Sequence, residues 1–146
     1  MPLQKPFFAT PQDAENAFYE AIRRADLEAF MAVWAEDEEV ICVLPSGPRL
    51  AGYANVREAW RRIFESGRRF VITLSQPLVL NGMLVSVHNV HEQIGVSGVS
   101  GGEGGQTAPI LATNVFIRSA VGWRILVHHA SPTQGEPAGE ISKTLH

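Results

Sequence analysis

Four polar side chains lie inside the last two apolar runs of the chain, and their types suit the binding or activation of a small molecule. The runs cover residues 111–118 and 123–131, and the four polar residues singled out in them are Asn114, His128, His129 and Ser131. Polar groups in an otherwise buried strand must find hydrogen-bond partners or face a wet cavity. A histidine near its ordinary pKa can act as a general base at neutral pH. We therefore expect Asn114 and His128 to anchor a ligand.

A further candidate base, His88, stands in an earlier strand-like run at residues 83–96. His88 and His91 are three positions apart, and His128 and His129 are adjacent, so each pair projects to opposite faces of a strand. A metal site built across strands from His88, His128 and Glu92 is less expected than hydrogen-bonded histidines. We predict no metal and no cofactor.

Glu92 is the one carboxylate well inside this run. We interpret it first as a solvated charge near a strand end, with a catalytic carboxylate as the alternative. Which residues face inward depends on strand register, because a slip of one residue reverses every side chain.

The first part of the chain predicts three helices. Thr10 can cap a helix whose first residue is Pro11. Asp26 is expected to cap a short second helix, which must end near the acidic run at residues 36–39. The third helix is expected to begin near Asn55 and to end at Gly67 in the left-handed conformation. In the first helix, apolar residues recur at helical spacing, whereas the opposite, polar face is assigned to Glu15, Glu20, Arg23 and Arg24.

The remaining signals predict strands and turns. A short strand at residues 40–44 precedes a turn at 45–48, and Asn81–Gly82 joins runs 70–80 and 83–96 as a hairpin. Pro77 indicates an edge strand or a bulge. The glycine-rich segment 95–105 is expected to be a mobile hairpin tip, open to a role as a lid, and it has no phosphate-loop spacing.

Length and composition favour one domain, over residues 1–132, with a flexible tail at 133–146. The net charge of -3 gives no footprint for nucleic acid or for an anionic membrane. No run is long enough to cross a bilayer and the N-terminus lacks the apolar core of a signal peptide, so we expect a cytoplasmic location. The single cysteine, Cys42, is interpreted as a buried hydrophobic residue.

Helices followed by a meander of strands predict an α+β fold, in which three N-terminal helices cover one face of a curved antiparallel sheet. Residues 110–117 and 125–127 are apolar on both strand faces. A strand that is buried on both sides has this pattern, so we predict a homodimer through the second sheet face.

The order of these elements, with Val33-Trp-Ala-Glu-Asp37 after the second helix and Gly122-Trp-Arg-Ile-Leu-Val-His-His-Ala-Ser131 at the end, resembles the nuclear transport factor 2-like superfamily. It looks closest to the small SnoaL-like and ketosteroid-isomerase-like bacterial proteins and to the association domain of calcium/calmodulin-dependent protein kinase. The resemblance covers about residues 10–132. It implies a cone-shaped, cystatin-like α+β barrel with a pocket between sheet and helices, but no single activity.

The same resemblance limits which chemistry is expected. The kinase association domain has pocket arginines at the positions of Asn114 and Ala130, so a carboxylate pocket of that kind is not implied. A ketosteroid-isomerase-like reaction needs acids that the strands scarcely supply. We predict a mainly apolar pocket for a small hydrophobic or amphipathic molecule. Its predicted lining residues are Tyr19, Trp34, Trp60, His88, Asn114 and His128. The alternatives are an isomerase, cyclase or hydrolase with His128 or His88 as general base, and a non-catalytic association module.

Overall fold

Three helices and six strands make up the part of the chain that the computed structural model describes, which is residues 6–36, 39–97 and 109–133. The helices are α1 (Pro11–Arg24), α2 (Leu27–Val33) and α3 (Tyr53–Glu65). The strands are β1 (Ile41–Val43), β2 (Arg49–Ala51), β3 (Arg69–Asn81), β4 (Val85–Ser97), β5 (Ile110–Ser119) and β6 (Gly122–Pro132). The predicted strand at residues 40–44 is present, whereas the pairing of β2 with it was not predicted.

The starts of α1 and α2 are as predicted. The Thr10 hydroxyl accepts a hydrogen bond of 3.0 Å from the Asp13 amide, and the Asp26 carboxylate accepts one of 3.0 Å from the Ala29 amide. Between the helices, Ala25 takes a left-handed conformation with φ of 53°. The two caps therefore fix a sharp turn that directs α2 away from the axis of α1.

The predicted cap of α3 was wrong. Gly52 occupies the cap position with φ of 96° and no side-chain hydrogen bond, and Asn55 lies inside the first turn, where its amide donates to the Ala51 carbonyl at 2.9 Å. A positive φ is cheap only for glycine, so the backbone at Gly52 sets the start of this helix. At the other end, Gly67 has φ of 88°, as predicted.

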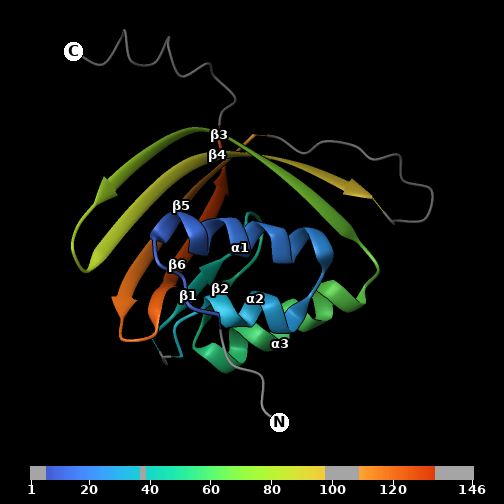
Figure 1. Ribbon diagram of the computed structural model, residues 1–146. Helices are drawn as coiled ribbons and strands as arrows, with labels where there is room; N and C mark the ends of the chain where they lie inside the picture. The colour runs from blue at the N-terminus through green and yellow to red at the C-terminus, as the bar shows by residue number, and fades with distance from the viewer. Residues whose placement is uncertain (1–5, 37–38, 98–108, 134–146) are drawn as a thin grey trace, which may run out of the picture.

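The six strands form one sheet in the order β2-β1-β6-β5-β4-β3. Figure 1 shows the sheet arching over α1, with α2 and α3 beyond it at the open side of the curve. The predicted α+β class with a curved sheet is confirmed. The sheet is not wholly antiparallel, because β1 pairs with β6 in parallel.

The edge strand β3 carries an irregularity at Pro77. Its register against β4 shifts between Ser75 and Leu78, and Gln76 has φ of 52°. Both the edge position and the bulge predicted from Pro77 are confirmed. The following hairpin closes after Asn81, where a Cβ on Gly82 would lie 2.8 Å from the Val85 carbonyl oxygen, so only glycine fits there.

A second irregularity sets which side of β6 faces the core. The register between β5 and β6 shifts at Val115 and Phe116, so Leu126 has no partner residue on β5. Ile125 and His128 are therefore both buried although they are three positions apart. This bulge explains why both faces of β6 look apolar in the sequence.

An aromatic cluster forms the core between the helices and the sheet. Phe30 packs against Trp60 and Phe18 with ring centroids 4.5 Å and 5.1 Å apart. Complete burial of one such ring contributes about 2 kcal/mol. Cys42 lies beneath Trp60, whose indole donates to its sulfur at 3.5 Å, and burial raises the pKa of the thiol to about 12. As predicted, Cys42 is a buried core residue.

Some predicted features lie outside the described residues. Gly95 and Ser97 belong to β4, but residues 98–108 of the glycine-rich segment are not described. Most of the predicted tail, from residue 134 onward, is also outside the described part. Among the residues that are described, no helix is both long and apolar enough to span a membrane.

Candidate functional site

A buried polar cluster lies where α1 crosses the concave face of β4, β5 and β6. Its members are Glu15, Tyr19, His88, Glu92, Asn114 and His128, and none is more than 9% exposed. Strand register places His88 opposite Asn114, and Asn114 opposite His128, in one row across the sheet. Residues four positions apart lie on the same face of a strand, so Glu92 of β4 lies on the same side as His88. The same spacing is about one turn of a helix, so Glu15 and Tyr19 lie on the same side of α1.

Glu15 corrects the sequence prediction, which placed it on the polar, outward face of α1. It is 3% exposed, and its carboxylate accepts a hydrogen bond of 3.0 Å from the Asn114 amide. A buried carboxylate needs such partners to offset lost hydration. The spacing of Glu15 and Tyr19, one helical turn apart beside Phe18, was the signal in the sequence.

The hydrogen bonds of Asn114 fix its orientation. Its amide nitrogen lies 3.0 Å from a Glu15 carboxylate oxygen and 3.0 Å from the Tyr19 hydroxyl. Because the Tyr19 hydroxyl already donates to Glu92, it can only accept from Asn114, so the donor NH2 group must stand on this side. The carbonyl oxygen of Asn114 therefore faces His128, whose Nδ1 is 2.6 Å away.

This contact fixes the proton on His128. The Asn114 carbonyl oxygen accepts and cannot donate, so Nδ1 carries the hydrogen and Nε2 keeps its lone pair. Burial, with a smaller effect from His129, lowers the pKa of His128 to about 3. The ring is therefore neutral at neutral pH and presents Nε2 as a hydrogen-bond acceptor.

Tyr19 and Glu92 form the second part of the cluster. The Tyr19 hydroxyl donates a hydrogen bond of 2.6 Å to Glu92, which is 3% exposed. The interpretation of Glu92 as a solvated charge near a strand end was wrong. Burial raises the pKa of Glu92, and burial together with the neighbouring Glu92 raises the pKa of Tyr19 well above its usual value.

A cavity of about 430 Å³, which we call the inner cavity, opens beside this cluster. Both Glu92 and His128 line it, and Arg68 and Ser46 add further polar groups. The rest of its wall is apolar and comes from Ile22, Leu44, Pro45, Trp60, Ile63, Phe70, Ile72, Ile94, Val96, Ile110 and Pro132. Small-molecule sites combine an apolar wall with a few polar groups in this way, and their volumes run from roughly 300 to 1,000 Å³.

The structure brings some of the predicted pocket residues to the inner cavity and not others. Trp60 and His128 line it. Tyr19 and Asn114 lie behind the wall and hold Glu92 and His128 by hydrogen bonds. Trp34 packs in the core against Phe18 and Phe30 and is not among the described residues that line the cavity.

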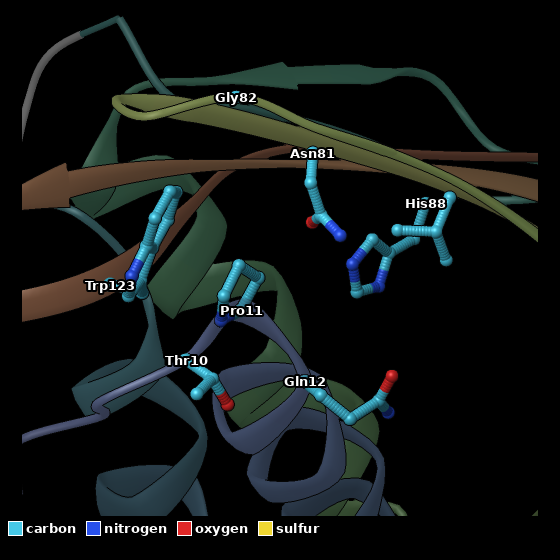
Figure 2. A pocket seen from close by; sticks show the side chains of 8 residues that line it. Thr10, Pro11, Gln12, Asn81, Gly82, His88 and Trp123 are labelled. Carbon is cyan, nitrogen blue, oxygen red and sulfur yellow. The ribbon is translucent and has the colours of Figure 1, made fainter.

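His88 faces a different space, which we call the N-terminal cavity. This cavity measures about 340 Å³, and Figure 2 shows the start of α1 below it and the end of β3 above it. Its lining residues are Thr10, Pro11, Gln12, Val79, Asn81, Gly82, His88 and Trp123. His88 is 2% exposed, and its Nδ1 lies 3.1 Å from a Glu15 oxygen without the alignment that a hydrogen bond requires.

No group of three potential metal ligands occurs among the described residues. His88 is buried and His91 half-buried on opposite faces of β4, and His128 is buried and His129 exposed on opposite faces of β6. The polar cluster is thus a hydrogen-bond network between carboxylates, an amide, a phenol and imidazoles.

Comparison with known proteins identifies relatives of the whole domain. A model of the SnoaL-like domain matches residues 12–134. A structure from Thiobacillus denitrificans, proposed to be a calcium/calmodulin-dependent protein kinase type II association domain, is 37% identical, with a TM-score of 0.73 over 88% of this chain and 99% of that chain. A proposed dehydratase of the NTF2-like family from Streptomyces avermitilis is 30% identical, with a TM-score of 0.72 over 82% and 91%.

One curated plant protein also matches. The F-box protein SKIP8 of Arabidopsis thaliana is 26% identical over 132 residues, which are 87% of this chain and 52% of that protein. The chain therefore spans about half the length of this curated relative.

Proposed function

The chain belongs to the SnoaL-like domain family, with the nuclear transport factor 2-like, cystatin-like fold, and on that premise we propose that its inner cavity binds a small organic molecule. The ligand is mainly apolar and carries a hydroxyl or another hydrogen-bond donor. One observation supports this proposal above the others: Asn114 holds the neutral His128 so that Nε2 remains free to accept a hydrogen bond.

The wall of the cavity supports the apolar character of the ligand. Trp60 and Ile63 of α3 line it together with Phe70 and Ile72 of β3. Burial of apolar surface against such side chains contributes about 25 cal/mol per Å². A single well-placed acceptor then orients the ligand, because a donor left without a partner in this wall costs about 1–3 kcal/mol.

Acid–base catalysis is a second candidate function. Environments that shift the pKa values of two neighbouring groups in opposite directions are typical of acid–base pairs, and burial lowers the pKa of His128 but raises that of Glu92. In an elimination, His128 Nε2 would take a proton from carbon while protonated Glu92 gives its proton to the leaving hydroxyl, which departs as water. The Streptomyces avermitilis relative, a proposed dehydratase, makes this reaction class the first to test.

The low pKa of His128 favours ligand binding over catalysis as the function of the inner cavity. A general base works best when its pKa is near the operating pH, and a pKa of about 3 makes His128 a weak base in the free protein. Accepting a hydrogen bond needs only the lone pair, which is present throughout the neutral range. The geometry therefore supports binding directly, whereas catalysis needs a substrate that changes the environment of His128.

The test of binding is a metabolite screen by thermal shift on the wild type, His128→Phe and the control His129→Phe, in which an exposed neighbour is changed. We expect ligands that stabilise the wild type and His129→Phe but bind His128→Phe about tenfold more weakly, as loss of one hydrogen bond predicts. Ligands that bind all three proteins equally would refute the role of His128. If the screen finds no ligand and the protein still assembles, the result would favour an association module, as proposed for the Thiobacillus denitrificans relative.

A separate readout tests catalysis. Carbonyl-containing ligands from the screen are incubated in D2O, and exchange of the hydrogen next to the carbonyl is followed by NMR. An acid–base site gives exchange in the wild type that is lost in both His128→Phe and Glu92→Gln. Bound ligands that never exchange would leave binding as the function and contradict the catalytic candidate.

A further inference from the structure

His88 is buried almost completely, yet its ring has no hydrogen bond to the described residues. Phe116 packs against it with ring centroids 4.9 Å apart, and Glu15 lies 3.1 Å from Nδ1. Figure 2 shows the other ring nitrogen, Nε2, directed into the N-terminal cavity. Since an unpaired buried polar group is costly, a ring held in this way is suited to a partner that enters the cavity.

Asn81 presents a donor to the same space. The Ser86 hydroxyl donates to the Asn81 carbonyl oxygen at 2.8 Å, which leaves the amide nitrogen on the other side. Figure 2 shows this nitrogen directed toward the His88 ring. A group that approaches between the two residues meets the N–H of Asn81 and the Nε2 of His88 together.

The start of α1 forms the floor of the cavity, through Thr10, Pro11 and Gln12. Pro11 has no N–H and the Asp13 amide donates to the Thr10 hydroxyl, so the Gln12 amide and the partial positive charge of the helix dipole are what this floor offers to a negative group. His88 is independent evidence for a ligand, because it belongs to β4 and not to the helix, is 2% exposed and directs Nε2 into the cavity. Val79, Pro11 and Trp123 give the cavity an apolar side.

We propose that the N-terminal cavity is a second ligand site, which takes a small molecule with one carboxylate and an apolar, aromatic-sized body. One carboxylate oxygen accepts from Asn81, and the other accepts from His88 Nε2–H. The apolar body lies against Val79, Pro11 and Trp123. This site is separate from the inner cavity and does not depend on the function proposed there.

The surrounding charges define how His88 takes part. Glu15 is the titratable group that faces the ring, and it stands behind Nδ1. Asn81 on β3, Phe116 on β5 and Trp123 on β6 bring no charge, while Asp13 lies exposed in the first turn of α1. Glu15 on the Nδ1 side leaves Nε2 as the ring nitrogen that faces a ligand in the cavity.

The experiment titrates the full chain with benzoate and with benzamide, its uncharged analogue, up to about 10 mM, because small probes of this size bind with millimolar affinity. Backbone and indole N–H signals report the location. We expect benzoate to shift the signals of Gln12, Gly82 and the Trp123 indole, and benzamide to bind at least about fivefold more weakly.

Single substitutions test which residues bind benzoate. Asn81→Leu, at an exposed position, and His88→Phe should each weaken benzoate binding about tenfold. His91→Phe, on the opposite face of the same strand, should leave it unchanged. If His88→Phe fails to fold, Asn81→Leu together with the benzamide comparison still decides.

Three results would overturn the proposal: no localised shifts with benzoate, equal binding of benzamide, or shifts confined to the residues of the inner cavity. Ile72→Trp separates the two sites, because the larger side chain fills the inner cavity and leaves the N-terminal cavity untouched. Benzoate shifts at Trp123 that survive in Ile72→Trp support the second site even if the inner cavity binds nothing.

Discussion

Asn114 determines what His128 can do. The amide is wholly buried, and each of its polar atoms has a hydrogen-bond partner, so it cannot turn over without losing them. It thereby assigns the proton of His128 to Nδ1 without any charge on the ring. A residue that never touches the inner cavity thus decides that the cavity receives an acceptor and not a donor.

His128 should make the protein acid-sensitive. Its pKa is about 3 in the folded state and about 6.5 in the unfolded state, so below pH 6.5 the unfolded state binds the extra proton. The free energy of unfolding then falls by about 1.4 kcal/mol per pH unit as the pH drops from about 6 toward 3. The measurement is urea unfolding of the wild type and His128→Phe over that range, where the difference between the two carries this slope. If the difference between the wild type and His129→Phe had the same slope, the effect would not belong to His128.

Glu92 should show the opposite dependence. Burial raises its folded-state pKa, so the folded state holds the proton more firmly, and the resulting stability is present at low pH and lost as the pH rises through the folded pKa. Glu92→Gln keeps an acceptor for the Tyr19 hydroxyl and removes the charge. We expect this variant to equal or exceed the wild type in melting temperature at pH 8, with the advantage shrinking at acidic pH.

Glu92→Leu is the matched comparison, because it also removes the charge but leaves the Tyr19 hydroxyl without its acceptor. It should cost about 1–3 kcal/mol relative to Glu92→Gln, and Tyr19→Phe should abolish that difference. A Glu92→Gln protein that melts well below the wild type at pH 8 would contradict the raised pKa.

At the scale of the elements, Asn114 joins three of them: α1 through Glu15 and Tyr19, β5 through its own backbone, and β6 through His128. Asn114→Leu should therefore cost about 3–5 kcal/mol, since it leaves buried polar groups on two neighbouring elements unpaired. Asn89→Leu is the control, because the Asn89 side chain donates a hydrogen bond of 2.9 Å to Thr113 on the half-buried face. It should cost about 1 kcal/mol in the same urea experiment, and equal losses would contradict the buried network.

Elements specified by local signals were predictable. Thr10 and Asp26 cap their helices through their own side chains, and Pro77 and Gly82 mark the bulge and the hairpin by steric rules that hold in any context. The start of α3 was not predictable in this way. Gly52 supplies backbone freedom but no side-chain contact, whereas Asn55 imitates a cap in the sequence.

The candidate site depends on distant contacts and was predicted only in part. The polar types of Asn114 and His128 in an apolar strand indicated the cluster. Glu15 and Glu92 were assigned to solvent because a carboxylate is usually exposed, and only the tertiary fold brings amide and phenol donors to them. The bulge at Leu126 likewise has no signal in the sequence, yet it decides that His128 faces inward.

At the scale of the whole molecule, the convex face of the sheet has the composition of an interface. Val87, Val115 and Val127 stand in register across β4, β5 and β6, and all three are half-buried on the face that the helices leave open. The β3–β4 hairpin extends this apolar surface with Leu80, 73% exposed, and Met83, 82% exposed. Exposed apolar surface of this extent marks an interaction site, and a second copy of the chain offers the same surface.

We therefore propose a homodimer through this convex face, centred on Val115. Val115→Lys places a charge at the centre, where its burial without a partner costs several kcal/mol, and should shift the protein from a dimer to a monomer of 16.0 kDa. Sedimentation equilibrium of the wild type and the variant measures the masses. Ala54→Lys, which adds the same charge on the exposed side of α3, should leave the dimer intact. Since Val115 points away from Asn114 and the cavities, Val115→Lys should keep the ligand affinity of the inner cavity. A monomeric wild type would refute the dimer but would leave the proposed ligand site unaffected.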